Sequence, residues 1–438
     1  MREGKRFILG EADLAIESHE IGPVSQHQIA VAGRLVEISR ANGLWRLRRR
    51  HRMSGYARFG TAIVTVPPRI PTRTFLGLVY LFHGLPVEDI GAIDVDNDEY
   101  ASELFRSALA MGLARAADEV SRTHVAQTYE VHHERLQVLR GRPVWKKELN
   151  RVRDGSIECQ FVLKTTDNLL NRLLLAGLGE ARKCLVSTGR SNVLQRQLSA
   201  WGGLATPKAT IERHDFSIAA DRLTRQTEAY GPALRLCEAL LLGTGNPNDS
   251  FKGHIALPIY DLAPMFEKLV QQLSIAIAAN YGRIAETQKT LKQVLRDGKR
   301  KKYRSFRPDA VISMGNQPAA VLDAKYKPHY TRLDPQRKNG HRVDRGDVFQ
   351  LFLYASLLGR KYGKPVPAYI AAPLLGEDSA VPPLDERRII LDDEVTRREY
   401  EMRVIPIPVV RIVDSLLEGK SRLEAAAHSE ELIEAVSS

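Results

Sequence analysis

Two short stretches decide the fold: Arg307-Pro308-Asp309, and Val321-Leu322-Asp323-Ala324-Lys325-Tyr326-Lys327. Both place charged residues beside apolar runs, so residues 306–314 and 319–326 predict two strands. The intervening Gly315-Asn316-Gln317-Pro318 predicts a hairpin connection between them. Asp323 and Lys325 are two residues apart and therefore leave the same face of a strand. Asp309, on the neighbouring antiparallel strand, can converge on them.

The residue types at these positions indicate metal-dependent hydrolysis. Asp309, Asp323 and the backbone carbonyl of Ala324 offer hard oxygens that suit Mg²⁺, with Mn²⁺ as the alternative ion. Lys325 can orient an attacking water or stabilise charge on a transferring phosphoryl group. Exposed strand charges are the simpler interpretation, but unpaired carboxylates inside apolar strands cost free energy. The pattern therefore favours a metal site.

Two predicted helices carry further candidates. Glu267 lies in a helix expected over 258–284, ahead of the first strand. Gln350 and Tyr354 are four residues apart in a helix expected over 347–361, so they share a face. Taken alone, Glu267 is typical of a surface residue and Tyr354 of a core aromatic. The order of all these elements is more specific than any one member.

This order resembles the PD-(D/E)xK nuclease superfamily, in which Pro308-Asp309 and Asp323-Ala324-Lys325 would be the named motif. With Gln350-x3-Tyr354-Ala355, it is similar more narrowly to the McrC family of nuclease subunits from McrBC restriction systems, which act on 5-methylcytosine DNA. Further segments extend the resemblance upstream: Val66–Ile70 (with Arg69 for a lysine), Leu139–Arg142, Glu158–Phe161, Thr166–Arg172 and Asp261–Glu267.

The resemblance implies roles for the candidate residues. Asp309 and Asp323 would bind the metal, Glu267 would complete or orient the metal shell, and Lys325 would be the catalytic lysine. Gln350 and Tyr354 would support the site or touch the DNA backbone. The protein would act in antiviral defence.

The resemblance also implies a partner, a hexameric McrB-like AAA+ GTPase that uses GTP and recognises modified DNA. The amino-terminal part of this chain would contact that GTPase and stimulate it. Gly419-Lys420-Ser421 is the only Gly-Lys-Ser in the sequence, and Asp414 stands where a P-loop needs its first glycine. We therefore expect no nucleotide bound by this chain itself.

Two basic stretches are candidates for contact with phosphate. Lys299–Arg307 leads into the first strand, where Lys301, Lys302, Arg304 and Arg307 would steer DNA, and Lys327 follows the second strand. A solvated loop is the simpler interpretation. For Arg46–Arg52, a solvated edge or hairpin and a phosphate or partner contact are equally favoured.

Composition sets outer limits on the function. The chain has 438 residues, with 64 Lys and Arg against 52 Asp and Glu, for a formal net charge of +12. This surplus is compatible with a polyanionic partner but is weak evidence by itself. Three widely spaced cysteines, no opening signal peptide and no apolar run of about 20 residues predict a cytoplasmic protein with no membrane segment.

The expected fold is a multi-domain α/β (α+β) protein. Residues 1–95 predict a β-rich domain with strands over 29–38 and 56–66, and the resemblance implies that this domain contacts the GTPase. Residues 96–245 predict a mainly helical domain, with a helical pattern over 96–139, and the glycine-rich 243–253 marks its end. Residues 246–438 predict the nuclease domain, a mixed sheet flanked by helices, with a further strand over 368–373.

Three functions remain open at this point. The first is a Mg²⁺-dependent DNA endonuclease subunit. The second is a non-cleaving DNA clamp that activates a GTPase. The third is a standalone PD-(D/E)xK nuclease for repair or a mobile element.

Overall fold

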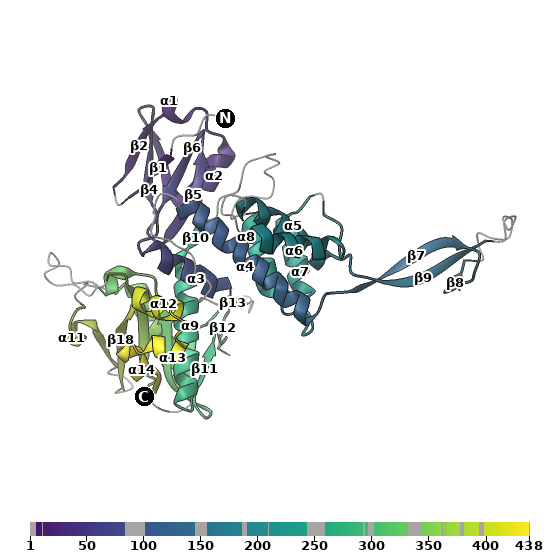
Figure 1. The fold of residues 1–438 in the computed structure, drawn as a ribbon. Coiled ribbons are helices and arrows are strands. Elements are labelled where there is room, and N and C mark those ends of the chain that lie inside the picture. Colours follow the sequence, from purple (N-terminus) through teal and green to yellow (C-terminus); the bar gives the residue numbers. More distant parts are fainter. Residues whose placement is uncertain are drawn as a thin grey trace. The chain divides into compact units, whose positions relative to one another are not determined.

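The chain forms two compact units, Met1–Ala101 with Ile259–Ser438, and Ser102–Pro258. They are seen in a computed structural model (Figure 1), which describes residues 6–10, 12–83, 101–144, 156–185, 191–208, 210–242, 259–291, 294–296, 302–331, 343–360, 363, 365–376, 381–393 and 398–437. The mixed α/β class is confirmed. The three-domain division stays a prediction, and its marker at 243–253 lies outside the described residues.

The amino-terminal part of the first unit holds two small sheets. Its elements are β1 (Arg6–Ile8), β2 (Leu14–Glu17), α1 (Ser18–Ile21), α2 (Gln26–Leu35), β3 (Val36–Ala41), β4 (Leu44–Arg49), β5 (Met53–Phe59), β6 (Ala62–Val66) and α3 (Thr72–His83). One sheet has the order β2-β4-β3, and the other β1-β6-β5-β10, where β10 is Ile259–Asp261. Pairing of β10 with β5 joins this part of the chain to the residues after 259.

The strand predicted over 29–38 is wrong for most of its length, because α2 extends to Leu35. Ser25 caps this helix: its Oγ accepts from the Gln28 N–H at 3.2 Å, and the Gln28 side chain accepts from the Ser25 N–H at 3.0 Å. Ala32 and Leu35 are fully buried at helical spacing, and only Val36 onward is extended. The β-branched residues obscured a helical period.

The arginine-rich stretch is not at a sheet edge. β4 is the central strand, paired with β2 on one side and β3 on the other. Its side chains alternate, so that Leu47 and Arg49 are buried while Arg46 and Arg48 are exposed. Arg49 Nη2 donates to the Pro67 carbonyl at 2.6 Å. The edge interpretation is therefore wrong, but the hairpin interpretation is confirmed, because β4 pairs antiparallel with β3 across the turn at Asn42-Gly43. Contact with phosphate or a partner stays a prediction.

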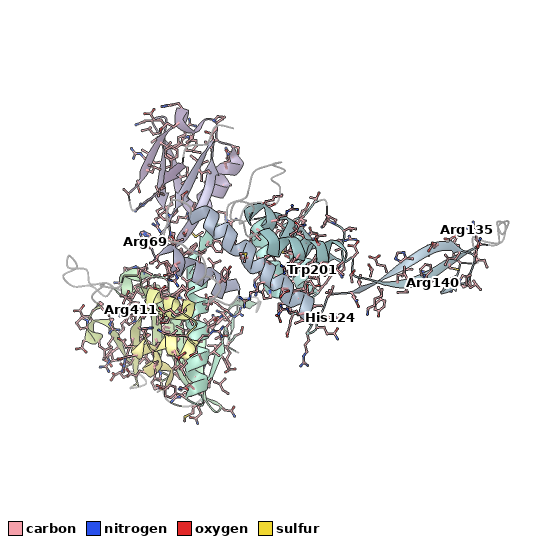
Figure 2. The ribbon with its side chains drawn as sticks, in the orientation of Figure 1. Arg69, His124, Arg135, Arg140, Trp201 and Arg411 are labelled. Atoms are coloured by element: carbon pink, nitrogen blue, oxygen red, sulfur yellow. The ribbon has the colours of Figure 1, made fainter. Side chains whose placement is uncertain are left out.

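The second unit combines a group of helices with a β-ribbon. Its elements are α4 (Ala101–Thr123), β7 (Thr128–Leu136), β8 (Arg142–Pro143), β9 (Ile157–Thr165), α5 (Leu169–Leu185), α6 (Ser191–Gly202), α7 (Arg213–Asp221) and α8 (Tyr230–Leu241). The helical pattern predicted to reach 139 is wrong beyond α4, because β7 pairs along its whole length with β9. The ribbon extends away from the helices of this unit (Figure 1) and carries Arg135 and Arg140 (Figure 2).

Two of the upstream resemblance segments meet on this ribbon. Arg142 is in register with Gln160. Gly141 has φ +70°, and a Cβ at this position would lie 2.4 Å from the Gln160 carbonyl oxygen, so only glycine is accommodated. The Arg140 guanidinium lies 4.5 Å from the centre of the Phe161 ring. These segments therefore build the ribbon.

The segment Thr166–Arg172 forms a buried polar hub at the start of α5. Asn171 is fully buried, and its Nδ2 donates to the Ala126 carbonyl at 3.0 Å and the Thr166 carbonyl at 2.6 Å. The Tyr230 hydroxyl donates to Asn171 Oδ1 at 2.5 Å and accepts from the Ala126 N–H at 2.9 Å. One side chain thus ties α5 and α8 to the chain between α4 and β7.

The remaining chain forms a six-stranded mixed sheet with flanking helices. After β10 come α9 (Leu262–Asn280), β11 (Ile284–Thr287), β12 (Val294–Arg296), β13 (Lys302–Ser305), β14 (Ala310–Met314), β15 (Gln317–Ala324), the 3-10 helix η5 (Pro328–Tyr330), α10 (Arg345–Gly359), β16 (Ala368–Leu374), α11 (Leu384–Arg387), β17 (Arg388–Asp393), β18 (Arg398–Pro408), α12 (Val409–Leu417), α13 (Arg422–Ala426) and α14 (Glu430–Ser437). The sheet order is β11-β14-β15-β16-β18-β17.

This part agrees with most of the sequence-based expectations. The predicted hairpin is β14–β15, the predicted helices are α9 and α10, and the predicted strand over 368–373 is β16. α9 packs against α3 and β11, and α10 packs against β15, β16 and β18. Among the residues that the structure describes, none of the helices is long and apolar enough to cross a membrane.

We expect Asn171→Ala to lower the free energy of unfolding by about 1–3 kcal/mol, because it removes the Asn171 hydrogen bonds to the Ala126 and Thr166 carbonyls and leaves the Tyr230 hydroxyl without an acceptor. Urea denaturation of the full chain measures this. Tyr230→Phe, which removes one hydroxyl from the same hub, should cost less. Equal stability of Asn171→Ala and the wild type would contradict the structural role of the hub.

Candidate metal-dependent active site

Strand pairing places the predicted aspartates side by side at one end of two neighbouring interior strands of the mixed sheet. β14 begins directly after Asp309, and β15 ends between Asp323 and Lys325. Because β14 and β15 are antiparallel, the start of one strand lies beside the end of the other. Val311 and Val321 share the alternation of the two aspartates and pack into the core under α10. The three candidates therefore lie on the α10 face of the sheet.

Lys325 is held by an acid on one side and an amide on the other. Its Nζ lies 2.7 Å from Asp323 Oδ2 and donates to Gln350 Oε1 at 3.3 Å. Gln350 Nε2 in turn donates to the Tyr354 hydroxyl at 2.8 Å. Asp323 is 3% exposed and Tyr354 4% exposed. The structure thus brings together four of the predicted residues and fixes the ammonium at the site.

Asp309 and Glu267 form the second half of the site. Asp309 Oδ2 accepts from the Ala324 N–H at 2.7 Å. Asp309 Oδ1 accepts from Gln288 Nε2 at 3.1 Å, and the same amide nitrogen also donates to Glu267 Oε1. Gln271 Nε2 donates to that Glu267 oxygen at 3.0 Å. Glu267 is therefore part of the site and not a surface residue, as α9 places it beside the end of β11.

Gln288 is the residue that sequence reasoning missed. It directly follows β11, an edge strand of four residues, and its N–H donates to the Asp309 carbonyl at 3.1 Å. Its φ of +53° is in the left-handed region, which glutamine seldom adopts. The short strand Ile-Ala-Glu-Thr has no distinctive pattern, and an isolated glutamine has no motif. Only the pairing of β11 with β14 reveals its place.

Burial sets the charge states of the site. Burial, followed by the Glu267 charge, raises the pKa of Asp309 to about 7. Burial also raises the pKa of Asp323 to about 6, although the Lys325 ammonium opposes the shift. Burial by itself would lower the pKa of Lys325, but the Asp323 carboxylate holds that pKa above its ordinary value. The lysine therefore stays charged while the acids titrate near neutral pH.

The chemistry of this donor set suits a divalent cation. The site holds three carboxylates and one ammonium, and burial raises the pKa of Asp309 and of Asp323, with the Glu267 charge adding to the shift at Asp309. Hard oxygens from Asp309, Asp323 and Glu267 are the ligands that Mg²⁺ prefers. Within the described ranges, no three His, Cys, Asp or Glu side chains converge tightly enough to define a metal site by geometry alone. The Ala324 carbonyl as a ligand stays a prediction.

The five basic residues that the sequence analysis expects at DNA have different surroundings in the structure. Arg307 Nε donates to the Gln288 carbonyl at 2.8 Å, so this side chain fixes the backbone beside the site. Lys327 Nζ lies 2.7 Å from Asp347 Oδ2 and 3.2 Å from the Tyr330 hydroxyl, which ties the end of β15 to the start of α10. Lys302 and Arg304 are on β13, and Lys301 lies outside the described residues. Contact of these five residues with DNA stays a prediction.

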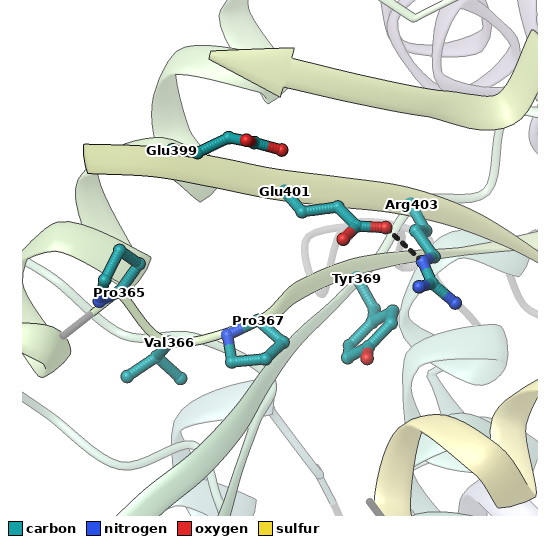
Figure 3. Close-up of a pocket in the computed structure, with 7 residues that line it drawn as sticks. All are labelled: Pro365, Val366, Pro367, Tyr369, Glu399, Glu401 and Arg403. Carbon is teal, nitrogen blue, oxygen red and sulfur yellow. Dashed lines mark hydrogen bonds and ion pairs between the residues drawn. The ribbon is translucent and has the colours of Figure 1, made fainter. Parts of the chain in front are cut away.

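A pocket elsewhere on the sheet is separate from this site (Figure 3). It is lined by Pro365, Val366, Pro367, Tyr369, Glu399, Glu401 and Arg403. Asp323 is in register with Ile370, so Tyr369 points to the opposite face of the sheet from Asp323. Arg403 Nε donates to Glu401 Oε1 at 2.5 Å inside the pocket. This arrangement offers no acid and lysine set comparable to that around Asp323.

Comparisons with known proteins bear on the family and the fold. The family described as McrBC 5-methylcytosine restriction system component matches residues 49–366. None of the curated proteins matches the chain. A chain in a half-complex from a tetradecameric assembly of Thermococcus gammatolerans McrB AAA+ hexamers with bound McrC is similar, with a TM-score of 0.53 and 14% identity, over 94% of this chain and 98% of that chain. This likeness supports the overall fold.

A second structure, of the Thermococcus gammatolerans McrBC complex, contains a chain with a TM-score of 0.39 and 15% identity, over 60% of this chain and 85% of that chain. A score this low carries no argument about the fold. The family match begins at the last residue of β4 and spans β5, β6, α3, the second unit and the candidate site through α10. The family expected from the sequence is therefore confirmed.

We expect divalent cation binding to weaken as the pH falls. Both aspartates are ionised at pH 8 and take up protons as the pH passes through about 7 and about 6, so protons compete with the cation. Isothermal titration with Mn²⁺ should show an affinity loss of about tenfold per pH unit between pH 7 and pH 6, and a steeper loss below pH 6 where both acids are protonated. Affinity that stays constant from pH 8 to pH 5.5 would contradict the raised pKa values.

Proposed function

From the premise that this chain belongs to the McrBC 5-methylcytosine restriction system component family, we propose that it is the nuclease subunit of such a system. It hydrolyses phosphodiester bonds of modified DNA with Mg²⁺, in assembly with an AAA+ GTPase that it stimulates. The proposal includes a PD-(D/E)xK nuclease fold for the mixed sheet with α9 and α10.

The proposal rests on one observation: Asp309, Asp323 and Lys325 lie together on one face of the sheet, where β14 begins and β15 ends. The two acids come from neighbouring strands and the ammonium lies 2.7 Å from one of them. A purely structural ion pair needs one acid for one lysine, whereas here Glu267 and Asp309 add further negative charge. Such an excess supports a site for a cation and a phosphate backbone.

Each residue of the site has a proposed task. A bound Mg²⁺ supplies Lewis acidity and lowers the pKa of a water molecule. Asp309 and Asp323 hold that ion, and Glu267 completes its shell. Lys325 keeps its proton and places a positive charge against the scissile phosphate. Gln350, which accepts from Lys325 and donates to Tyr354, keeps the ammonium pointed at the reacting group.

The division of labour with a partner is also proposed. The similar structure in the comparisons is one of McrB AAA+ hexamers with bound McrC. By analogy, we infer that a GTPase of this kind binds this chain, through residues 1–95 as the sequence suggests, and delivers modified DNA to the site. The exposed arginines of β4 are available for this contact.

The test is cleavage by the assembled complex with GTP, Mg²⁺ and 5-methylcytosine DNA. We expect Asp309→Asn, Asp323→Asn and Lys325→Met each to reduce strand scission by at least about 10³-fold, because each removes a charge on which the transition state depends. GTPase stimulation should persist in all three variants. Cleavage at the wild-type rate by Asp309→Asn or Asp323→Asn would reject the site.

The same assay separates the alternative functions. GTPase stimulation by the wild-type chain without strand scission, under Mg²⁺ and Mn²⁺ alike, would support a non-cleaving DNA clamp. Cleavage by the purified chain with no partner would support a standalone nuclease. The excess of carboxylates at the site favours cleavage over clamping, because a clamp has no use for acids beside a phosphate backbone.

A further inference from the structure

We propose that Gln288 is a positioning residue that acts as a latch: its amide holds the Glu267 and Asp309 carboxylates together and is displaced when a divalent cation binds there. This inference rests on the proposed cation site but adds a residue that neither the sequence motif nor the family match assigns. As a consequence, the uncharged side chain of Gln288 lowers the affinity of the site for the cation.

The hydrogen bonds of Asp309 show what the amide occupies. Oδ2 accepts from the backbone N–H of Ala324 at 2.7 Å, a donor fixed by its strand, so the donor that can move aside for a cation is the one on Oδ1. That oxygen accepts from Gln288 Nε2 at 3.1 Å. Glu267 Oε1 accepts from the same nitrogen. The amide therefore lies between one oxygen of Asp309 and one oxygen of Glu267, where an ion shared by the two carboxylates would lie.

The orientation of the amide follows from its partners. A carboxylate only accepts hydrogen bonds, and the Gln288 NH₂ group has two hydrogens to donate, one for each acid. Two N–H donors partly offset the repulsion between two buried negative charges. A cation shared by Asp309 Oδ1 and Glu267 Oε1 would take the place of the Gln288 nitrogen between them, so cation and amide compete for one position.

The backbone at Gln288 is built to hold this placement. Its φ of +53° is unfavourable for a side chain with a Cβ, and such strain is retained where the surroundings enforce it. Two further contacts do so: the Gln288 N–H donates to the Asp309 carbonyl at 3.1 Å, and Arg307 Nε donates to the Gln288 carbonyl at 2.8 Å. The backbone of Gln288 is thus held by one hydrogen bond at its N–H and another at its carbonyl.

The experiment measures Mn²⁺ binding to the full chain by isothermal titration at pH 8, without DNA or partner. Gln288→Ala removes the amide and keeps the strained backbone, while Gln288→Gly removes the amide and relaxes it. We expect both variants to bind Mn²⁺ about tenfold more tightly than the wild type, equivalent to about 1.4 kcal/mol. In EDTA, Gln288→Ala should melt at a lower temperature, and saturating Mn²⁺ should close that gap.

Gln271→Ala is the matched control. Gln271 also donates to Glu267 Oε1, at 3.0 Å, but no hydrogen bond links it to Asp309 in the described residues. Its loss should change Mn²⁺ affinity by less than about threefold, well below the effect of Gln288→Ala. An equal effect of the two substitutions would overturn the latch, since any lost bond to Glu267 would then suffice.

The remaining outcomes are equally distinct. Weaker Mn²⁺ binding in both Gln288 variants would mean that this side chain ligates the cation, which overturns the latch. Unchanged binding would overturn it as well. Asp309→Ala separates the two proposals: if it abolishes Mn²⁺ binding while Gln288→Ala has no effect, only the latch fails. If Asp309→Ala binds Mn²⁺ like the wild type, the cation site itself fails.

Discussion

The gathering of three carboxylates, two of them buried, around one ammonium is the constraint on which the candidate site depends. Asp309 and Asp323 are 8% and 3% exposed, so water screens little of their mutual repulsion. The fold answers with donors drawn from different elements: a backbone N–H at the end of β15, an amide after β11 and a lysine beside α10. Each donor offsets part of the negative charge of the carboxylates. The negative charge that remains is what a cation would neutralise.

The resemblance segments separate into chemical and structural groups. Asp309, Asp323 and Lys325 meet at one site, and Asp261 Oδ1 accepts from the Ala263 N–H at 3.0 Å as the cap of α9, the helix that carries Glu267. Thr166–Arg172, in contrast, surrounds the buried Asn171, and Gly141 serves a close backbone approach. A family-like motif is therefore not by itself a functional site. Burial and hydrogen bonding show which purpose each motif serves.

Much of the mixed sheet could be predicted, because its elements have strong local patterns. Short apolar strands flanking Gly315-Asn316 specify a hairpin, and the apolar stretch after Asp261 specifies a long helix. Two elements differ from the prediction: Gln26–Leu35 is a helix where a strand was expected over 29–38, and Thr128–Leu136 is a strand where a helical pattern was expected to reach 139. In the first case β-branched residues imitate a strand, and in the second the ribbon alternates weakly because most of its side chains are exposed on both faces.

The sequence by itself determined the acids, the lysine, their spacing along two strands and the family. Alternation along a strand is a local property, so Asp323 and Lys325 had to share a face. Only the tertiary structure decided that Gln288 bridges Glu267 and Asp309, that Arg307 holds the Gln288 backbone, and that Lys327 is paired with Asp347. These contacts join residues that are distant in the chain, and their partners are chosen by strand pairing and burial, which no local pattern encodes.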